Sequence, residues 1–251
     1  MKASIIATGT EITRGLTLNT NANHLSKILS ELGIDVNYHV AVPDNEELIL
    51  QALHLSQDCD IIITTGGLGP TSDDITRTVV CKFANEPVTW NDEQWNILCE
   101  KQKTRGRQAK ELHKQQCLFP STAIIINNSV GTANGFYFLK NKNHFFVLPG
   151  PPNEIQSLLD NGFMNKFTEL SNLNPDQTHS KTWTTIGTRE SQIAEWLKPI
   201  EEKYKELNIG YRINLPEIEV RLLYKKSQKN IAEACSEEIG QALKNILVKK
   251  F

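Results

Sequence analysis

Short apolar runs alternate with stretches of helical periodicity through the first 65 residues. The runs at 4–8, 34–42 and 60–65 are compact and are predicted to be strands. Between them, leucine, isoleucine and alanine recur at helical spacing in residues 20–32 and 44–55. A strand-helix-strand-helix-strand order is typical of a parallel sheet that is covered by helices on both faces. We therefore predict an α/β domain whose ligand site lies at the carboxyl ends of its strands.

Residues that commonly cap helices mark the ends of the two predicted helices. Asn19 or Thr20 is expected to cap the first helix, and Gly33 is expected to close it. Asp44 precedes Glu47 by three residues, which predicts a capping acid at the start of the second helix. Asp44 also follows a predicted strand, so a ligand contact is a second interpretation, although capping alone would explain the residue.

The loop after the third predicted strand is rich in glycine and ends in two acids. It reads Thr65-Gly66-Gly67-Leu68-Gly69-Pro70-Thr71, and Asp73 and Asp74 follow. Glycine permits positive φ and close approach, so backbone N–H groups here can surround phosphate oxygens. Two carboxylates beside a phosphate would repel it unless a divalent cation lies between them, so the loop suggests metal plus phosphate. The alternative is a tight turn whose aspartates cap a helix that begins near Asp73.

Polar residues also follow the first predicted strand and open the first helix. Gly9, Thr10 and Glu11 end the strand, and Asn19 and Asn21 begin the helix. Both groups are expected to line one crevice. Glu11 is a candidate metal ligand or general base, whereas helix capping and ligand contact are equally good interpretations of the two asparagines.

The next hundred residues predict further helices and a hairpin. Two helical stretches follow Asn91, and the basic run 101–110 within them is interpreted as a solvated helix face rather than a phosphate contact. Strands are predicted at 122–126, 136–139 and 144–148, and the polar segment between the last two predicts an antiparallel hairpin. The sequence Pro149-Gly150-Pro151-Pro152 then positions a helix from Asn153.

A polar break at 171–180 separates a second predicted unit. It contains a strand at 181–186, a helix at 191–207, two strands around Pro216 and a final helix from Asn230, in the order βαββα. We therefore predict two domains, 1–171 and 172–251.

Composition excludes several classes of protein. The chain has 27 Lys and Arg against 29 Asp and Glu, without the basic excess of proteins that bind nucleic acid through its phosphates. Its five cysteines form no CxxC pair, which favours reduced thiols in a cytoplasmic protein. No apolar run approaches the ~20 residues that span a bilayer, so no membrane partner is expected.

Several separated motifs resemble those of the CinA family, in the family's order. They are Gly9-Thr10-Glu11 with Gly15, Asn19-Thr20-Asn21-Ala22, the loop 65–71 with Asp73, Asp74 and Thr76, Asn128 with 130–133 and 135–136, and 148–150 with Pro152 and Glu154. The resemblance covers residues 1 to about 170. It implies the three-layer, mostly parallel sheet of the molybdopterin-binding (MoCF) fold.

The second unit resembles the KH-like middle domain of CinA proteins. The family tends to carry a Gly-x-Gly-Glu-Ser turn there, and this chain has Arg189 in place of the second glycine. No GXXG loop is present in this second unit, so RNA binding is not expected. A scaffolding or dimerising role, in a homodimer or other homo-oligomer, is the prediction.

The resemblance implies hydrolysis of ADP-ribose to AMP and ribose 5-phosphate with a divalent metal, Mg²⁺, Mn²⁺ or Co²⁺. The predicted catalytic residues are Asp73, Asp74 and Glu11, of which the two aspartates would hold the metal and Glu11 would orient or deprotonate water. The backbone of 66–69 would hold the diphosphate. The expected ligand contacts are Gly9, Thr10, Asn19, Asn21, Asp44, Thr65, Gly66, Gly67, Leu68, Gly69, Thr71, Asn128, Gly131, Thr132, Pro149, Gly150, Pro151 and Glu154.

Two other functions stay open at this point. Related domains bind molybdopterin during molybdenum cofactor biosynthesis, again with a glycine-rich loop and acids. A non-catalytic nucleotide-binding module is the third interpretation. Longer CinA proteins carry a carboxy-terminal deamidase domain, and because the sequence stops at Phe251, deamidase activity is not expected.

Overall fold

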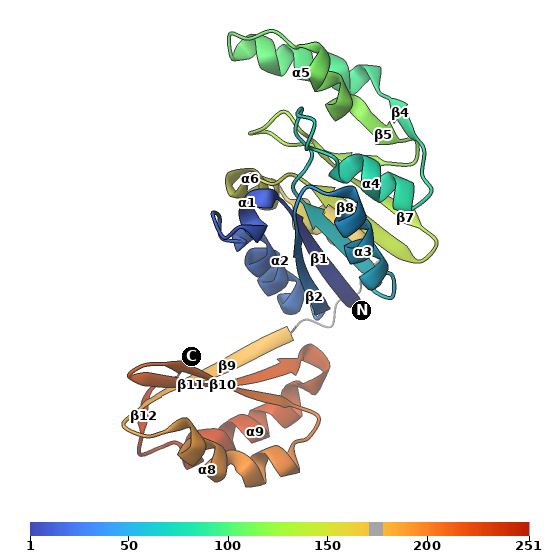
Figure 1. The fold of residues 1–251 in the computed structure, drawn as a ribbon. Helices are drawn as coiled ribbons and strands as arrows, with labels where there is room; N and C mark the ends of the chain where they lie inside the picture. The colour runs from blue at the N-terminus through green and yellow to red at the C-terminus, as the bar shows by residue number, and fades with distance from the viewer. Residues whose placement is uncertain (171–177, 251) are drawn as a thin grey trace. The chain divides into compact units, whose positions relative to one another are not determined.

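The computed structural model describes residues 1–170 and 178–250 (Figure 1). They form two compact units, the first built almost wholly from residues before 171 and the second from residues after 177. The predicted boundary at 171/172 and most of the polar break lie outside the described residues.

A six-stranded sheet in the order β2-β1-β3-β8-β7-β6 forms the centre of the first unit. Strands β2, β1, β3 and β8 are parallel to one another, and β7 is antiparallel to both β8 and β6. The parallel arrangement and the predicted hairpin are both observed. The strands are β1 (Lys2–Thr8), β2 (Asp35–Val42), β3 (Ile61–Thr65), β6 (Ile124–Ile126), β7 (Gly135–Lys140) and β8 (Asn143–Leu148).

Helices cover this sheet on both faces. Ile49 and Leu53 of α3 and Val80 of α4 pack in one buried cluster with Ile6 and Ile62 of the sheet. On the opposite face, Phe167 of α7 packs against Phe146 of β8, with their ring centroids 4.5 Å apart. Figure 1 shows α2 and α3 on opposite sides of β1. The helices are α2 (Thr20–Glu31), α3 (Glu46–Leu55), α4 (Thr76–Phe83), α6 (Pro152–Asp160) and α7 (Phe163–Leu170), with the single turn α1 (Thr10–Thr13) after β1.

An excursion between α4 and β6 carries elements that the sequence only partly predicted. It consists of β4 (Val88–Trp90), α5 (Asp92–Thr104), the 3₁₀ helix η1 (Glu111–Cys117) and β5 (Leu118–Pro120), which pairs antiparallel with β4. The second helical stretch predicted after Asn91 is therefore 3₁₀. Strands β4 and β5 have three residues each, which is too short for an alternation pattern to reveal.

Two predicted helix starts need correction. Asn45, and not Asp44, caps α3, because the Asn45 side chain accepts a hydrogen bond from the Leu48 N–H at 3.1 Å. Helix α4 begins at Thr76 with no side-chain cap, so neither Asp73 nor Asp74 caps it. The cap at Asn19 is as expected, since its side chain accepts from the Ala22 N–H at 3.2 Å.

The second unit has one antiparallel sheet in the order β10-β11-β9-β12. Trp183, Val220 and Leu197 are fully buried in its core. The βαββα order is observed with one addition, the terminal strand β12, which was not predicted. The elements are β9 (Thr178–Ile186), α8 (Glu190–Lys203), β10 (Asn208–Asn214), β11 (Glu217–Lys225), the 3₁₀ turn η2 (Lys226–Gln228), α9 (Lys229–Ala242) and β12 (Leu247–Lys250).

Among the described helices of both units, none combines the length and the apolar character that a membrane crossing requires.

Candidate functional site

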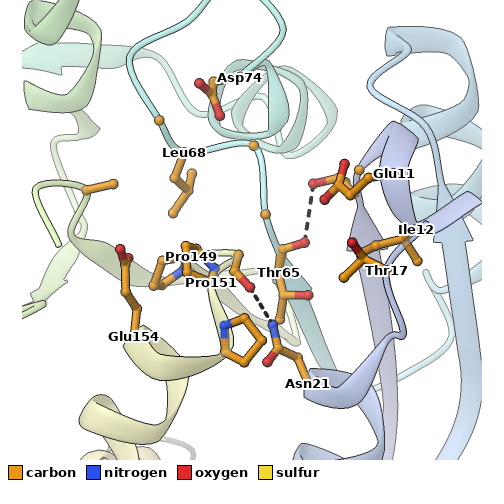
Figure 2. A pocket seen from close by; sticks show the side chains of 18 of the residues that line it. Glu11, Ile12, Thr17, Asn21, Thr65, Leu68, Asp74, Pro149, Pro151 and Glu154 are labelled. Carbon is orange, nitrogen blue, oxygen red and sulfur yellow. Dashed lines mark hydrogen bonds between the residues drawn. The ribbon is translucent and has the colours of Figure 1, made fainter. Parts of the chain in front are cut away.

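A cavity of about 450 Å³ opens at the carboxyl ends of three neighbouring strands of the first unit. Gly9 follows β1, Gly66 follows β3, and Pro149 follows β8, and all three line the cavity. Figure 2 shows the acids Glu11, Asp74 and Glu154 on three sides of it, around Leu68 and two prolines. The site therefore lies where the fold class predicts a ligand.

The glycine-rich loop adopts backbone conformations that require glycine. Gly66 and Gly67 have φ values of +100° and +63°. A Cβ on Gly66 would lie 2.2 Å from the Thr8 carbonyl oxygen, and one on Gly67 would lie 2.1 Å from the Thr76 hydroxyl. The loop thus packs directly on the end of β1 and on the start of α4, where no side chain fits.

Of the four N–H groups of residues 66–69, one is used within the protein and three are not. The Gly66 N–H donates to the Leu148 carbonyl at 3.1 Å, so it is not available to a ligand, contrary to the predicted cradle of 66–69. Within the described part of the chain, the N–H groups of Gly67, Leu68 and Gly69 donate no hydrogen bond. An anion cradle here would consist of residues 67–69.

Protein donors bind the carbonyl groups of the same loop. Gln115 Nε2 donates to the carbonyls of Gly69 and Thr71, at 2.9 and 2.8 Å. The Leu68 carbonyl accepts from Gln116 Nε2 at 3.4 Å, and that of Gly67 accepts from the Thr76 N–H at 3.2 Å. The protein thus binds the carbonyls of the loop. The N–H groups of residues 67–69 have no such partner among the described residues and remain available to a ligand.

Asp74 shapes the loop as well as lining the cavity. Its Oδ2 accepts from the Thr71 N–H at 2.8 Å and from the Thr71 hydroxyl at 2.6 Å. A Cβ on Gly69 would lie 2.4 Å from the same oxygen, so that glycine makes room for the carboxylate. The nearby Thr71 side chain also holds the pKa of the exposed Asp73 below its usual range.

Glu11 and Asp44 come from the other side of the cavity. Asp44 Oδ2 accepts from the Thr10 N–H at 2.9 Å and from the Thr10 hydroxyl at 3.0 Å, which holds the turn α1 against the end of β2. That turn carries Glu11 to the cavity. Within the described residues, the Glu11 carboxylate accepts no hydrogen bond, so it is free to meet a ligand or a water molecule.

Glu154 is half-buried on the third side, where Asn128 holds it. Asn128 Nδ2 donates to Glu154 Oε2 at 2.6 Å, and a Cβ on Gly131 would lie 2.4 Å from Glu154 Oε1. Burial raises the pKa of Glu154, and the Asn128 hydrogen bond, Arg105 and Lys101 oppose this shift. Lys101 Nζ donates to the Asn128 carbonyl at 2.6 Å, so this part of the basic run supports the loop that carries Asn128.

Comparison with known proteins agrees with this architecture. Residues 4–166 match the family described as "Probable molybdopterin binding domain", and residues 180–251 match "Damage-inducible protein CinA KH domain". The chain belongs to the CinA family. The predicted family and fold class are thereby confirmed.

Named relatives and one solved structure show the extent of the likeness. The chain is 34% identical over 251 residues to a "Putative competence-damage inducible protein" of Clostridium novyi, and 33% identical to a protein of that name from Caldicellulosiruptor saccharolyticus. It covers 59% and 60% of those proteins, while 98% of the chain is matched in each case. The crystal structure of "the protein CinA with unknown function" from Thermoplasma acidophilum is 28% identical, with a TM-score of 0.60, and the match covers 66% of this chain and 98% of that one.

Most of the contacts expected from the CinA motifs line the cavity. The exceptions are Thr10, Thr71, Asn128 and Gly131, which position Asp44, Asp74 and Glu154 instead. The predicted residues that do line the cavity are Gly9, Glu11, Asn19, Asn21, Asp44, Thr65, Gly66, Gly67, Leu68, Gly69, Asp73, Asp74, Thr132, Pro149, Gly150, Pro151 and Glu154.

Some lining residues were missed by sequence reasoning. Ile12, Thr17 and Leu18 lie in the sequence among residues of two family motifs, and this position could have predicted that they line the cavity. Gln116 gave no local signal, since it comes from η1, about fifty positions after the loop that it contacts. The other missed lining residues are Thr8, Thr20, Pro70, Ala133 and Pro152.

The acids of the cavity suit a metal ion only if a bound ligand supplies further coordinating oxygens. No group of three or more His, Cys, Asp or Glu side chains in the described residues is arranged to hold a metal. Asp73 and Asp74 offer two adjacent carboxylates. Mg²⁺ commonly binds through one or two carboxylates together with substrate phosphates and water, and this acid pair suits such a shared ion.

Proposed function

We propose that the first unit binds a small phosphate-bearing heterocycle, of the pterin or nucleotide class, with its phosphate on the N–H groups of residues 67–69. The observation that carries this proposal is the glycine loop beside a cavity of about 450 Å³: the protein binds its carbonyls, and its N–H groups at 67–69 have no partner among the described residues. Ligand pockets of this kind usually have volumes of about 300–1,000 Å³.

A molybdopterin-type ligand is the first candidate, because the family that matches residues 4–166 is described by that ligand. Such a ligand combines a fused heterocycle with a phosphate. Apolar side chains of Leu68, Pro149 and Pro151 lie beside the loop and would contact the ring system.

Metal-dependent hydrolysis of ADP-ribose to AMP and ribose 5-phosphate is the second candidate. The acids Glu11, Asp74 and Glu154 around the cavity favour it, because carboxylates beside a diphosphate need a cation. Asp73 and Asp74 would hold that divalent cation, Mg²⁺, Mn²⁺ or Co²⁺, which supplies charge neutralisation beside the phosphates. Glu11 would orient the attacking water or accept its proton.

Release of AMP from ADP-ribose separates the candidates. The assay uses the purified chain with EDTA, and then with Mg²⁺, Mn²⁺ or Co²⁺ restored. Calorimetry runs in parallel with ADP-ribose, AMP and a pterin phosphate. AMP release that depends on metal supports hydrolysis, and tight pterin binding without turnover supports the molybdopterin candidate.

Two variants make the result specific to the site. Asp74→Asn keeps an oxygen acceptor for Thr71 and removes the charge, so the fold should remain while turnover is lost. Asp35→Asn changes an exposed aspartate at the start of β2 and should behave as wild type. Nucleotide binding without turnover, unaffected by EDTA, would instead make the unit a non-catalytic nucleotide-binding module. Absence of binding to every phosphate compound would refute the proposal.

The second unit is proposed to join copies of the chain in a homodimer or other homo-oligomer. Light scattering on the whole chain, and on a chain that ends at residue 170, tests this. A mass that does not fall from oligomer to monomer on truncation would contradict it.

A further inference from the structure

Arg77 is the one charged side chain among the buried residues of the described chain, with 4% of its surface exposed. It belongs to the first turn of α4, directly after the glycine-rich loop. Its Nη1 donates to the Gln115 carbonyl. Its Nε and Nη2 have no hydrogen-bond partner, and no carboxylate of the described residues forms an ion pair with it.

This guanidinium stays charged at neutral pH. Burial lowers its pKa, but only to about 10. The rings of Phe119 and Phe136 lie 5.2 and 5.9 Å from its central carbon and offset part of the cost of burial. A buried charge without a paired carboxylate is unfavourable for folding, so the fold carries a positive charge that it does not neutralise locally.

Hydrogen bonds connect Arg77 and its neighbour Thr76 to the loop that carries the free N–H groups. Arg77 binds the backbone of Gln115, and the Gln115 side chain binds the carbonyls of Gly69 and Thr71. The preceding residue, Thr76, binds the Gly67 carbonyl through its N–H. Arg77 itself does not line the cavity, so it would act on a ligand through the loop and through its electrostatic field.

We propose that Arg77 is a positioning residue for ligand phosphate, which fixes the loop 67–71 through Gln115 and supplies the positive charge that favours a phosphorylated ligand over its unphosphorylated form. This inference rests on the proposed phosphate binding and deepens it. Asp73 and Asp74 add negative charge near the cradle, and the Arg77 charge opposes it from the protein side. A low-dielectric surrounding makes such a charge effective over a longer range than in water.

The preference for AMP over adenosine, measured by calorimetry at low salt, tests the role of the charge. Arg77→Met keeps the apolar stem and removes the charge. We expect this variant to bind AMP roughly tenfold more weakly and to bind adenosine as wild type does. An effect of this size is expected for the loss of the attraction between two unit charges roughly 10 Å apart at an effective dielectric constant of about 20. Arg77→Lys should keep most of the preference. Arg107→Met, at an exposed position, is the matched control.

Each outcome decides between named alternatives. Equal weakening of AMP and adenosine by Arg77→Met would make Arg77 purely structural and overturn the inference. An unchanged AMP preference would also overturn it, with phosphate binding left intact. If Arg77→Met does not fold, Arg77→Lys decides, and complete loss of the preference in that folded variant refutes the role of charge. If wild type binds none of AMP, pyrophosphate and a pterin phosphate, the proposed function fails as well.

Discussion

Replacement of Asn128 by alanine should destabilise the first unit more than any other asparagine-to-alanine change near the cavity. Asn128 is fully buried. Its Nδ2 donates to the Ala133 carbonyl at 2.9 Å and to Glu154 at 2.6 Å. Its Oδ1 accepts from the N–H groups of Val130 and Gly131, at 3.1 and 2.8 Å. One side chain thus fixes both the loop after β6 and the carboxylate on the third side of the cavity.

The expected magnitude follows from these four hydrogen bonds. A buried intramolecular hydrogen bond contributes about 0.5–1.5 kcal/mol, and a group left buried without a partner costs about 1–3 kcal/mol. Val130 is partly exposed and can bind water instead, whereas the Gly131 N–H and the Ala133 carbonyl are buried. We therefore expect a loss of about 3 kcal/mol in the free energy of unfolding. Asn128→Asp should cost more, because its new carboxylate would face that of Glu154.

Hydrogen exchange at increasing urea concentration measures this change for each unit separately. Peptides from β7 and β8 report on the first unit, and peptides from β9 and β11 serve as an internal reference that should not change. Asn153→Ala, at an exposed position of α6, is the matched control and should stay within about 0.5 kcal/mol of wild type. If Asn128→Ala lies within about 1 kcal/mol of that control, the assignment of Asn128 as the central hydrogen-bonding residue is wrong.

Three further predictions concern the site. Gly67→Ala places a Cβ 2.1 Å from the Thr76 hydroxyl at a φ of +63°. It should cost more stability in urea unfolding than Gly106→Ala, where φ is +68° and nothing lies within 4 Å; equal losses would contradict the predicted clash. The raised pKa of Glu154 means that its contribution to stability is complete below about 4.5 and is lost as pH rises through the folded-state pKa. In Glu154→Gln, the urea midpoint should therefore fall less as pH rises than it does in wild type. The same dependence of the urea midpoint on pH in both proteins would contradict this prediction. Asp74→Asn should abolish any metal-dependent AMP release while leaving the urea midpoint close to that of wild type, and full activity in this variant would exclude a metal role for Asp74.

The order of strands and helices was predictable because long periodic stretches form the centre of the first unit. The runs at β1, β2 and β3 and the helices α2 and α3 have strong apolar patterns, and the strand-ending loops then had to meet at one edge of the sheet. The short elements β4, β5 and α1 were not predictable, because three or four residues hold too little pattern. These short elements are stabilised by contacts with distant parts of the chain.

The capping residue of α3 shows how distant contacts decide between local alternatives. Asp44 and Asn45 are adjacent, and both residue types cap helices well. The choice depends on Thr10, thirty-four positions earlier, whose N–H and hydroxyl bind the Asp44 carboxylate and leave Asn45 to cap the helix. A local rule correctly predicted that a cap lies here but selected the wrong residue.

The same reasoning applies to the glycine loop and limits what its motif can specify. Glycines at 66 and 67 permit the backbone conformation, but they do not determine which way the peptide groups of the loop face. That direction is set by Gln115 and Gln116, which bind carbonyls 44 to 48 positions away. A Gln115→Leu variant would keep every residue of the motif, yet its loop would lose the two hydrogen bonds that the Gln115 side chain donates to the Gly69 and Thr71 carbonyls. If phosphate affinity in that variant falls while adenosine binding persists, the cradle depends on long-range support as well as on its glycines; unchanged affinity would show that the motif alone is sufficient.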